Sequence, residues 1–192
     1  MYEKPGLRAS LFARAVVCSL LALICGAVSA FAARPYVPAE KVEALSAGTA
    51  HSIKGVGVCV DYDTGNGVFN SFYLTADLVD ILTGKASTPG LKFTYHYNIV
   101  LKDLCEGKYI IYAGPGVTSG YVRNTDDHSG FMGGVSLDAG VRMKCLKNIY
   151  LSLEYQADAS LIFKNKYNPY MRLYRAGFLY AWAPYLRIQY NF

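Results

Sequence analysis

The side chains best suited to acid–base chemistry in this sequence are its three histidines, His51, His96 and His128. His128 follows Asp126 and Asp127 in a polar segment, and carboxylate and imidazole groups together can bind a divalent ion. A turn-rich segment fixes no coordination geometry, so we interpret this one as a solvated acidic loop. His96 lies within an alternating segment, on its polar side, which is typical of a hydrogen-bonded interior histidine rather than of a general base.

The local motifs that mark common catalytic or cofactor sites are missing from the sequence. It contains no Gly-x-Ser-x-Gly turn, no Cys-x-x-Cys pair and no glycine-rich phosphate-binding loop. Catalysis by a nucleophile, a base and an orienting acid would require the three groups within hydrogen-bond reach, and no spacing in the sequence indicates such a set. The sequence therefore predicts no catalytic residue, no cofactor and no metal.

Charged residues of both signs recur on the polar side of several alternating segments. If that side faces the inside of a barrel, the interior polar network consists of Asp61, Asp77, Lys92, His96, Asp138, Arg142, Lys144, Glu154, Asp158 and Arg187. Buried charges should pair, because leaving one alone costs several kcal/mol. The interior of an eight-stranded barrel is just wide enough for side chains to fill. We expect a plugged core of salt bridges and hydrogen bonds, and a continuous ion path is the alternative.

The elements that would position these residues are β-strands that alternate apolar and polar residues. Successive side chains of a strand point to opposite faces. In the last segment one face would carry Leu186, Ile188, Tyr190 and Phe192, and the other Arg187, Gln189 and Asn191. The same alternation begins at Leu91, at Phe131 and at Ile149. One face of each strand suits lipid, and the other suits water or a polar interior.

Other segments carry the pattern less clearly. Alternation also begins at Val56 and at Phe72, whereas residues 109–122 are ambiguous because glycines leave one face almost bare and Pro115 interrupts the ladder. Residues that tolerate turn dihedrals separate the segments. Transmembrane strands need only about 9 to 11 residues each, which reconciles abundant hydrophobic residues with the lack of a long apolar run after residue 32.

The first 32 residues predict a secretory signal peptide. Arg8 and Arg14 precede an uncharged, mostly apolar run that closes on Ala30-Phe31-Ala32. A membrane-anchoring helix is the alternative, because the run has roughly the length that spans a bilayer. The small residues in its second half favour cleavage after Ala32. We expect a signal peptide over 1–32, a lead segment over 33–47 and a barrel over 48–192.

Charge and cysteine content exclude two classes of protein. The net charge of +5 is scattered along the chain, which is no nucleic-acid footprint. Beyond the signal peptide the chain has three cysteines, Cys59, Cys105 and Cys145, too few for a disulfide scaffold. Cys105 and Cys145 lie beside tight connections at what should be the same barrel rim, so they are the candidates if two cysteines pair.

The signal peptide, the repeated alternation over residues 48–192 and the terminal Tyr190-x-Phe192 together resemble the small outer-membrane β-barrels of Gram-negative envelopes, of the OmpA and OmpX kind. The resemblance implies an all-β fold, a transmembrane antiparallel up-and-down barrel of eight strands, integral in the outer membrane. It implies outer-membrane lipids, lipopolysaccharide and the barrel-assembly machinery as partners, with Tyr190 and Phe192 as the assembly signal. Nucleic acid is not an expected partner, and an extracellular ligand is possible.

Members of this class serve as structural or binding proteins, narrow pores or lipid-modifying enzymes. The resemblance and the lack of a catalytic set favour a structural role or binding through exposed loops. A narrow channel is the second interpretation, and a lipid-modifying enzyme is the third.

The strand count admits two schemes. In the first, residues 55–62 form the first strand and a turn at 181–184 divides the last segment, which places the tightest turns outside the cell. In the second, one long final strand carries Phe178, Tyr180 and Trp182 on its lipid face, and an extra first strand lies near residues 44–53. Both schemes have eight strands, as bacterial barrels require an even number. The sequence leaves the orientation open.

Overall fold

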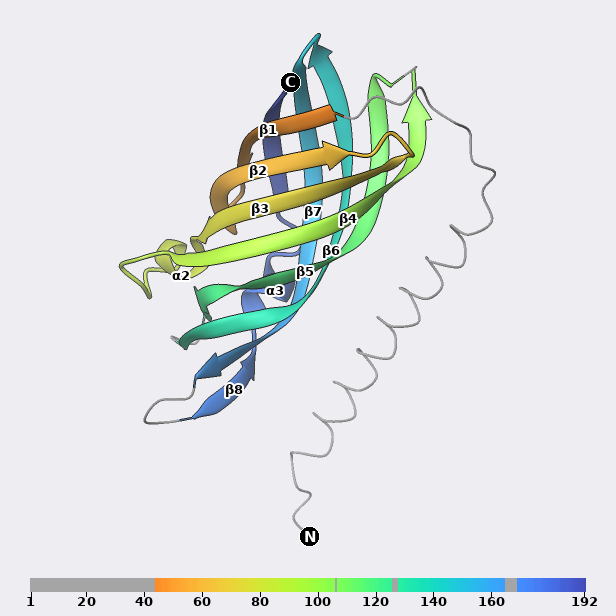
Figure 1. Ribbon diagram of the computed structural model, residues 1–192. Coiled ribbons are helices and arrows are strands. Elements are labelled where there is room, and N and C mark those ends of the chain that lie inside the picture. The colour runs from red at the N-terminus through yellow and green to blue at the C-terminus, as the bar shows by residue number, and fades with distance from the viewer. Residues whose placement is uncertain (1–43, 106, 126–127, 165–168) are drawn as a thin grey trace. The chain divides into compact units, whose positions relative to one another are not determined.

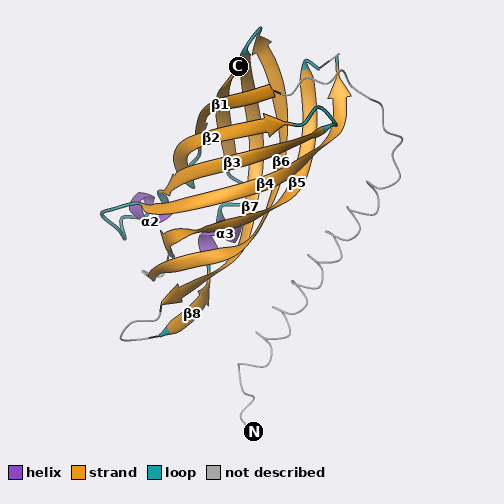
Figure 2. Cartoon of the chain, viewed as in Figure 1, coloured by secondary structure: helices purple, strands orange, loops and turns teal. Residues whose placement is uncertain are grey.

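The computed structural model describes residues 44–105, 107–125, 128–164 and 169–192. The predicted signal peptide and most of the predicted lead segment lie outside these residues. The described elements are β1 (Ala44–His51), β2 (Gly55–Asp63), β3 (Val68–Asp77), α2 (Val79–Leu82), β4 (Gly90–Leu104), β5 (Tyr109–Arg123), β6 (Ser129–Leu146), β7 (Ile149–Lys164), β8 (Tyr170–Leu173), α3 (Arg175–Leu179) and β9 (Pro184–Asn191). Figures 1 and 2 show that strands dominate this part of the chain.

The strands form a closed antiparallel barrel. Each strand from β1 to β7 pairs with the next along the chain, and β9 pairs with both β7 and β1. Because β8 pairs only with the far end of β7, eight strands of the described chain complete the wall. The backbone N–H of Phe192 also donates to the carbonyl oxygen of Leu45 at 3.0 Å. The predicted eight-stranded up-and-down barrel is confirmed.

The strand boundaries support the second scheme at the N-terminus. An extra first strand, β1, begins at Ala44, so residues 44–47 belong to the barrel rather than to the expected lead segment. The first scheme is therefore wrong in beginning the barrel at residue 55. The short β2–β3, β4–β5 and β6–β7 connections all lie at the rim where β1 begins and β9 ends. The longer connections, with α2 and α3, lie at the opposite rim, which we call the loop rim (Figure 1).

The final strand is broken by a turn just before Pro184, as the first scheme predicted and contrary to the second. β8 pairs with Leu161–Lys164 of β7 and β9 with Ile149–Tyr155, and the chain between them forms α3 and a turn. Phe178, Tyr180 and Trp182 therefore do not share the face of a continuous strand. Proline has no N–H to donate to a ladder and is tolerated at the first residue of a strand, which is where Pro184 lies.

The glycines of β5 explain the ambiguity of that segment. A Cβ atom on Gly116 would lie 2.3 Å from Cδ2 of His96, and one on Gly114 would lie 2.7 Å from Oδ1 of Asn98. The bare face thus points inward and accommodates larger side chains of β4. The β4–β5 ladder has no pairs for Tyr97 and Asn98, opposite Pro115 and Gly114, but its register is the same on both sides of this gap and shifts only between Val100 and Lys102. The interruption predicted at Pro115 is therefore confined to the β4 side of β5, because the β5–β6 ladder continues through Pro115.

At the loop rim the barrel is filled by an apolar cluster. It consists of Val79, Val122, Met132, Ile162, Tyr174 and Ala176. α3 lies against β7 so closely that a Cβ atom on Gly177 would be 2.4 Å from the carbonyl oxygen of Asp158. None of the described helices is long and apolar enough to cross a bilayer.

Candidate functional site: the barrel interior

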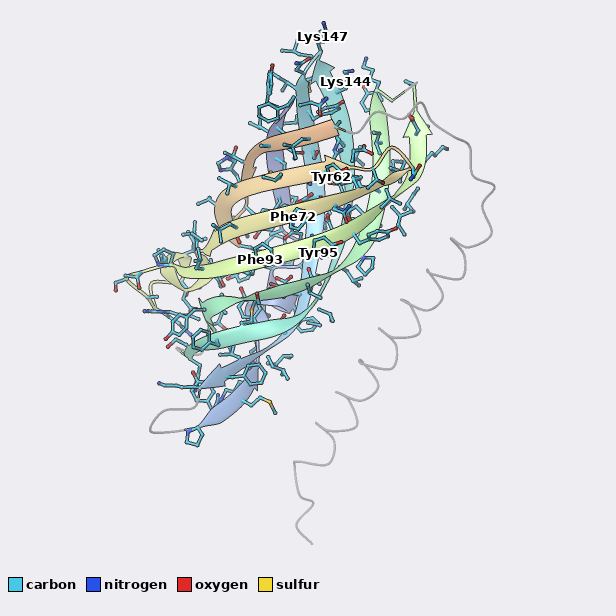
Figure 3. All side chains as sticks on the ribbon, viewed as in Figure 1. Tyr62, Phe72, Phe93, Tyr95, Lys144 and Lys147 are labelled. Atoms are coloured by element: carbon cyan, nitrogen blue, oxygen red, sulfur yellow. The ribbon has the colours of Figure 1, made fainter. Side chains whose placement is uncertain are left out.

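The outer surface of the barrel is apolar around its circumference. The exposed large hydrophobic side chains include Val58, Phe72, Leu74, Leu91, Phe93, Val117, Val135, Leu153, Leu186 and Ile188. Figure 3 shows Tyr62, Phe72, Phe93 and Tyr95 on the strands of this wall. Asn70, a polar residue on the same face, accepts a hydrogen bond from the Tyr95 hydroxyl at 2.7 Å. The wall therefore exposes the kind of apolar side chains that a water-soluble protein buries.

The interior holds charged and polar side chains. Nine of the ten residues of the predicted network are buried there: Asp61, Asp77, Lys92, His96, Asp138, Arg142, Glu154, Asp158 and Arg187. Lys144 is exposed, so its assignment to the interior is wrong. It has the parity of the inward face but lies beyond the last buried residue of β6, Arg142, where the register with β7 shifts.

Arg187 forms the centre of the network. Its Nη1 donates to Oε2 of Glu154 at 2.8 Å and to the hydroxyl of Tyr73 at 2.7 Å, and its Nη2 is ion-paired with Asp61. The same Glu154 oxygen accepts hydrogen bonds from the hydroxyls of Tyr73 at 3.0 Å and Tyr112 at 2.8 Å. Five strands thus meet at one guanidinium and one carboxylate.

Arg142 completes this centre from β6. It is ion-paired with Asp61, and its guanidinium lies 4.1 Å from the centroid of the Phe69 ring. Phe69 in turn contacts Tyr112 edge to face, with ring centroids 4.9 Å apart. Asp61 therefore shares its charge between two arginines, and aromatic rings cover the rest of the arginine surface.

A second group of polar contacts lies around Asp158. Nζ of Lys92 is 2.9 Å from Oδ2 of Asp158, and the Ser136 hydroxyl donates to Oδ1 at 2.8 Å. Nε2 of His96 lies 2.9 Å from the Ser136 oxygen. Ser136 was not among the residues predicted for the network, although its inward parity on β6 could have indicated it.

Lys54 reaches this group from outside the strands. It lies in the β1–β2 connection, yet its ammonium donates to the carbonyl oxygen of Gln156 and lies 3.9 Å from Oδ2 of Asp158. Burial lowers the pKa of Lys54 to about 8, against the attraction of Asp158. No strand periodicity could have selected a turn residue whose side chain enters the barrel.

The apolar cluster at the loop rim is fixed by a polar contact. The Tyr174 hydroxyl donates to Oδ2 of Asp77, and Oδ1 of Asp77 accepts the backbone N–H of Val79 at 3.1 Å. A single carboxylate at the end of β3 therefore holds both α2 and the chain that leads into α3.

The histidines do not form a base-activated nucleophile. His96, Ser136 and Asp138 follow one another as in a hydrolytic triad, with Nδ1 of His96 at 3.9 Å from Asp138. However, the Ser136 hydroxyl donates to Asp158, so it offers no proton to His96. His51 is exposed on β1, and the His128 ring contacts Tyr170 with centroids 5.2 Å apart. Within the described ranges, no cluster of histidine, cysteine and acidic residues could hold a metal ion.

Two of the three described cysteines and the terminal aromatic residues lie at the rim of the short turns. Cys105 and Cys145 are exposed there and do not form a disulfide, and Cys59 is buried and also free. Tyr190 and Phe192 are exposed, and their rings contact edge to face with centroids 5.2 Å apart. The terminal aromatic residues thus extend the apolar wall to the end of the chain.

The comparisons with known proteins concern the fold. The chain is similar to the N-terminal β-barrel domain of Pseudomonas aeruginosa OprF, with 12% identity, a TM-score of 0.49 and coverage of 78% of this chain and 96% of that one. It is also similar to Neisserial surface protein A (NspA), with 15% identity, a TM-score of 0.38 and coverage of 78% and 93%. No protein-family model and no curated protein matches the sequence.

Proposed function

We propose that this chain is an integral outer-membrane β-barrel protein with a structural role. The observation that carries the proposal is the reversed distribution of side chains, with an exposed apolar wall and charged residues buried inside. In water such a wall would be a large exposed apolar surface, which soluble monomers rarely have. In a bilayer the same wall contacts lipid, and a closed barrel leaves no unpaired strand edge in the hydrocarbon.

The filled interior favours a structural role over conduction. Side chains from opposite sides of the wall are bonded directly, as Tyr73 and Tyr112 are to Glu154. The apolar cluster, held by the Tyr174–Asp77 contact, covers this network at the loop rim. An ion would have to displace both layers to cross the barrel.

Hydrogen bonds between neighbouring loops hold the loop rim in a defined conformation. The Lys85 ammonium donates to the carbonyl oxygen of Thr125, and Nδ2 of Asn124 donates to that of Leu173 at 3.2 Å. These contacts connect the β3–β4 loop and β8 to the β5–β6 connection. Any binding of an extracellular ligand would use this rim, because loops carried on rigid strands are where recognition residues concentrate. Lipopolysaccharide and outer-membrane lipids would surround the wall.

Reconstitution of the purified barrel into planar bilayers tests this proposal. Heat-modifiable gel migration and a strand-dominated circular dichroism spectrum in detergent should establish a folded barrel first. We expect no stable single-channel steps from that material. Regular conductance steps would favour the narrow channel, and a soluble helical product would refute the barrel itself. Altered lipid A mass spectra on expression would favour a lipid-modifying enzyme.

A further inference from the structure

Asp138 differs from the other carboxylates at the centre of the interior because no lysine or arginine of the described chain forms an ion pair with it. The others are paired: Asp61 with Arg142 and Arg187, Glu154 with Arg187, and Asp158 with Lys92 and Lys54. Oδ2 of Asp138 accepts a hydrogen bond from Nδ2 of Asn98 at 3.2 Å, and Oδ1 has no hydrogen-bond partner among the described residues. The one ionisable contact described for it is Nδ1 of His96, at 3.9 Å.

The proton on the other nitrogen of His96 follows from Ser136. An ionised carboxylate only accepts hydrogen bonds, so the contact between Ser136 and Oδ1 of Asp158 uses the single hydroxyl hydrogen of Ser136. The 2.9 Å contact between Ser136 and His96 must then be donated by Nε2–H of His96. Nε2 is thereby assigned its proton, and Nδ1 is the nitrogen that faces Asp138.

A bare Nδ1 lone pair facing a carboxylate would leave two acceptors opposed with no hydrogen between them. Both residues are fully or almost fully buried, at 0% and 2% exposure, and an unpaired buried carboxylate is costly. One added proton removes the opposition of the two acceptors and the unpaired buried charge. This holds whether the proton resides on Nδ1 or on the carboxyl group. We propose that His96 and Asp138 form a proton-binding site inside the barrel, in which one of the two residues carries one proton at neutral pH.

The groups that face this site come from all the strands packed around it. β3 contributes the Tyr73 ring, with its centroid 5.6 Å from that of His96, and Ser71, which accepts a hydrogen bond from Asn98. β5 contributes Gly116, which makes room for the imidazole ring, and the hydroxyl of Tyr112, which interacts with Asp138. The charged residues around the pair are Asp61, Lys92, Glu154, Asp158 and Arg187, with Lys54 from the β1–β2 connection. Because the two groups are only 3.9 Å apart, their protonation steps are coupled and belong to the pair as a whole.

The proton links barrel stability to pH with a defined sign. In the unfolded chain a histidine releases its proton near pH 6.5, while the folded pair retains its proton above that pH. The folded state then binds more protons than the unfolded state, so stability falls as pH rises from about 6.5. One retained proton changes the unfolding equilibrium constant up to about tenfold per pH unit.

The test compares the wild-type barrel with Asp138→Asn in lipid vesicles. The asparagine amide is neutral and has nearly the shape of the protonated carboxyl group, but it has no titratable proton. From pH 6.5 to 8 the unfolding equilibrium constant of the wild type should rise with pH relative to that of D138N. His51 and His128 are the same in both proteins and cancel in the comparison. Identical pH slopes would overturn the proposal.

A spectroscopic measurement guards against a variant that fails to fold. In the wild-type protein at pH 7, infrared difference spectra should show a protonated carboxyl group assignable to Asp138, or the nitrogen resonances of His96 should show a doubly protonated ring. Either result supports one proton in the pair. A carboxylate together with a singly protonated His96 would refute it, whatever the conductance or lipid-insertion results show.

Discussion

Arg187 in the last strand and Asp61 in the second strand form an ion pair inside the barrel, with the whole of β1 between their strands in the wall. Their side chains are 0% and 1% exposed. The contact therefore joins the closing strand to the start of the barrel through the interior, in addition to the ladder between β9 and β1. The charge balance of the core and the closure of the wall depend on the same residue.

Arg187→Gln should therefore destabilise the barrel strongly. The change leaves Glu154 without its cation and removes one of two arginines from Asp61. Breaking a buried pair from one side costs about 3–5 kcal/mol. Urea unfolding of the barrel in vesicles measures the loss. The matched control is Lys144→Gln, since Lys144 is exposed at the rim and its change should cost less than about 0.5 kcal/mol. Equal losses in the two variants would contradict the central role of Arg187.

Gly116→Ala should destabilise the barrel or prevent its assembly. The added methyl would meet the His96 ring at 2.3 Å and the backbone oxygen of Tyr95 at 2.2 Å, so the wall would have to shift. Overpacking of this kind typically costs about 1–3 kcal/mol or more. Gly133→Ala is the control, because nothing lies within 4 Å of the position that a methyl group on that residue would occupy. The fraction of folded barrel on unheated gels is compared between the two variants. Equal fractions would show that β5 can move away from β4 to accommodate the added methyl group.

Phe192→Ser should lower the amount of assembled barrel in the outer membrane without opening a core cavity. Phe192 is 74% exposed, so its removal loses little packing within the chain. Phe131→Ser is the control because Phe131 is similarly exposed, at 71%, and lies inside β6 rather than at the chain end. The membrane fraction should contain less assembled F192S than F131S. Normal assembly of F192S would remove the terminal aromatic residue as a recognition signal.

The pH dependence contributed by Lys54 should have the opposite sign to that of the His96–Asp138 pair. The pKa of Lys54 is lowered from 10.5 to about 8 by burial, so between these values the unfolded chain binds more protons. Stability relative to Lys54→Met should rise with pH from about 8 to 10.5, by at most about 1.4 kcal/mol per pH unit. Urea midpoints at successive pH values provide the measurement. If the difference in urea midpoint between the wild type and Lys54→Met does not change with pH, the Lys54 ammonium is solvated.

Much of the wall was predictable from the sequence, because a period of two fixes which residues share a face. The segments beginning at Leu91, Phe131 and Ile149 have the predicted parity along their middle parts, and in β4 the parity ends at the bulge between Val100 and Lys102. Parity does not fix height along the barrel axis, which is why Lys144 was assigned to the interior. The alternation of residues in strands also cannot predict that residues outside the strands enter the barrel, as Lys54 and α3 do.

The sequence left open whether the last segment is one strand or is divided by a turn at 181–184, and neither scheme included the helix α3. Aromatic residues at 178, 180 and 182 match a strand pattern, and only the pairing of β8 and β9 with separate parts of β7 reveals the helix between them. The interior bonds were predictable in kind but not in partner. Which arginine meets Asp61 depends on strand tilt and register, and these are properties of the closed wall rather than of any one segment.

The hydrogen bond between Phe192 and Leu45 brings the last residue of the chain beside the second residue of β1. A short linker between these ends, with new termini opened in the β2–β3 turn, would give a circularly permuted chain that retains every strand ladder. That chain would end on a residue other than Phe192. Its assembly in cells, compared with its refolding in detergent, would separate closure of the barrel from recognition of its last residue.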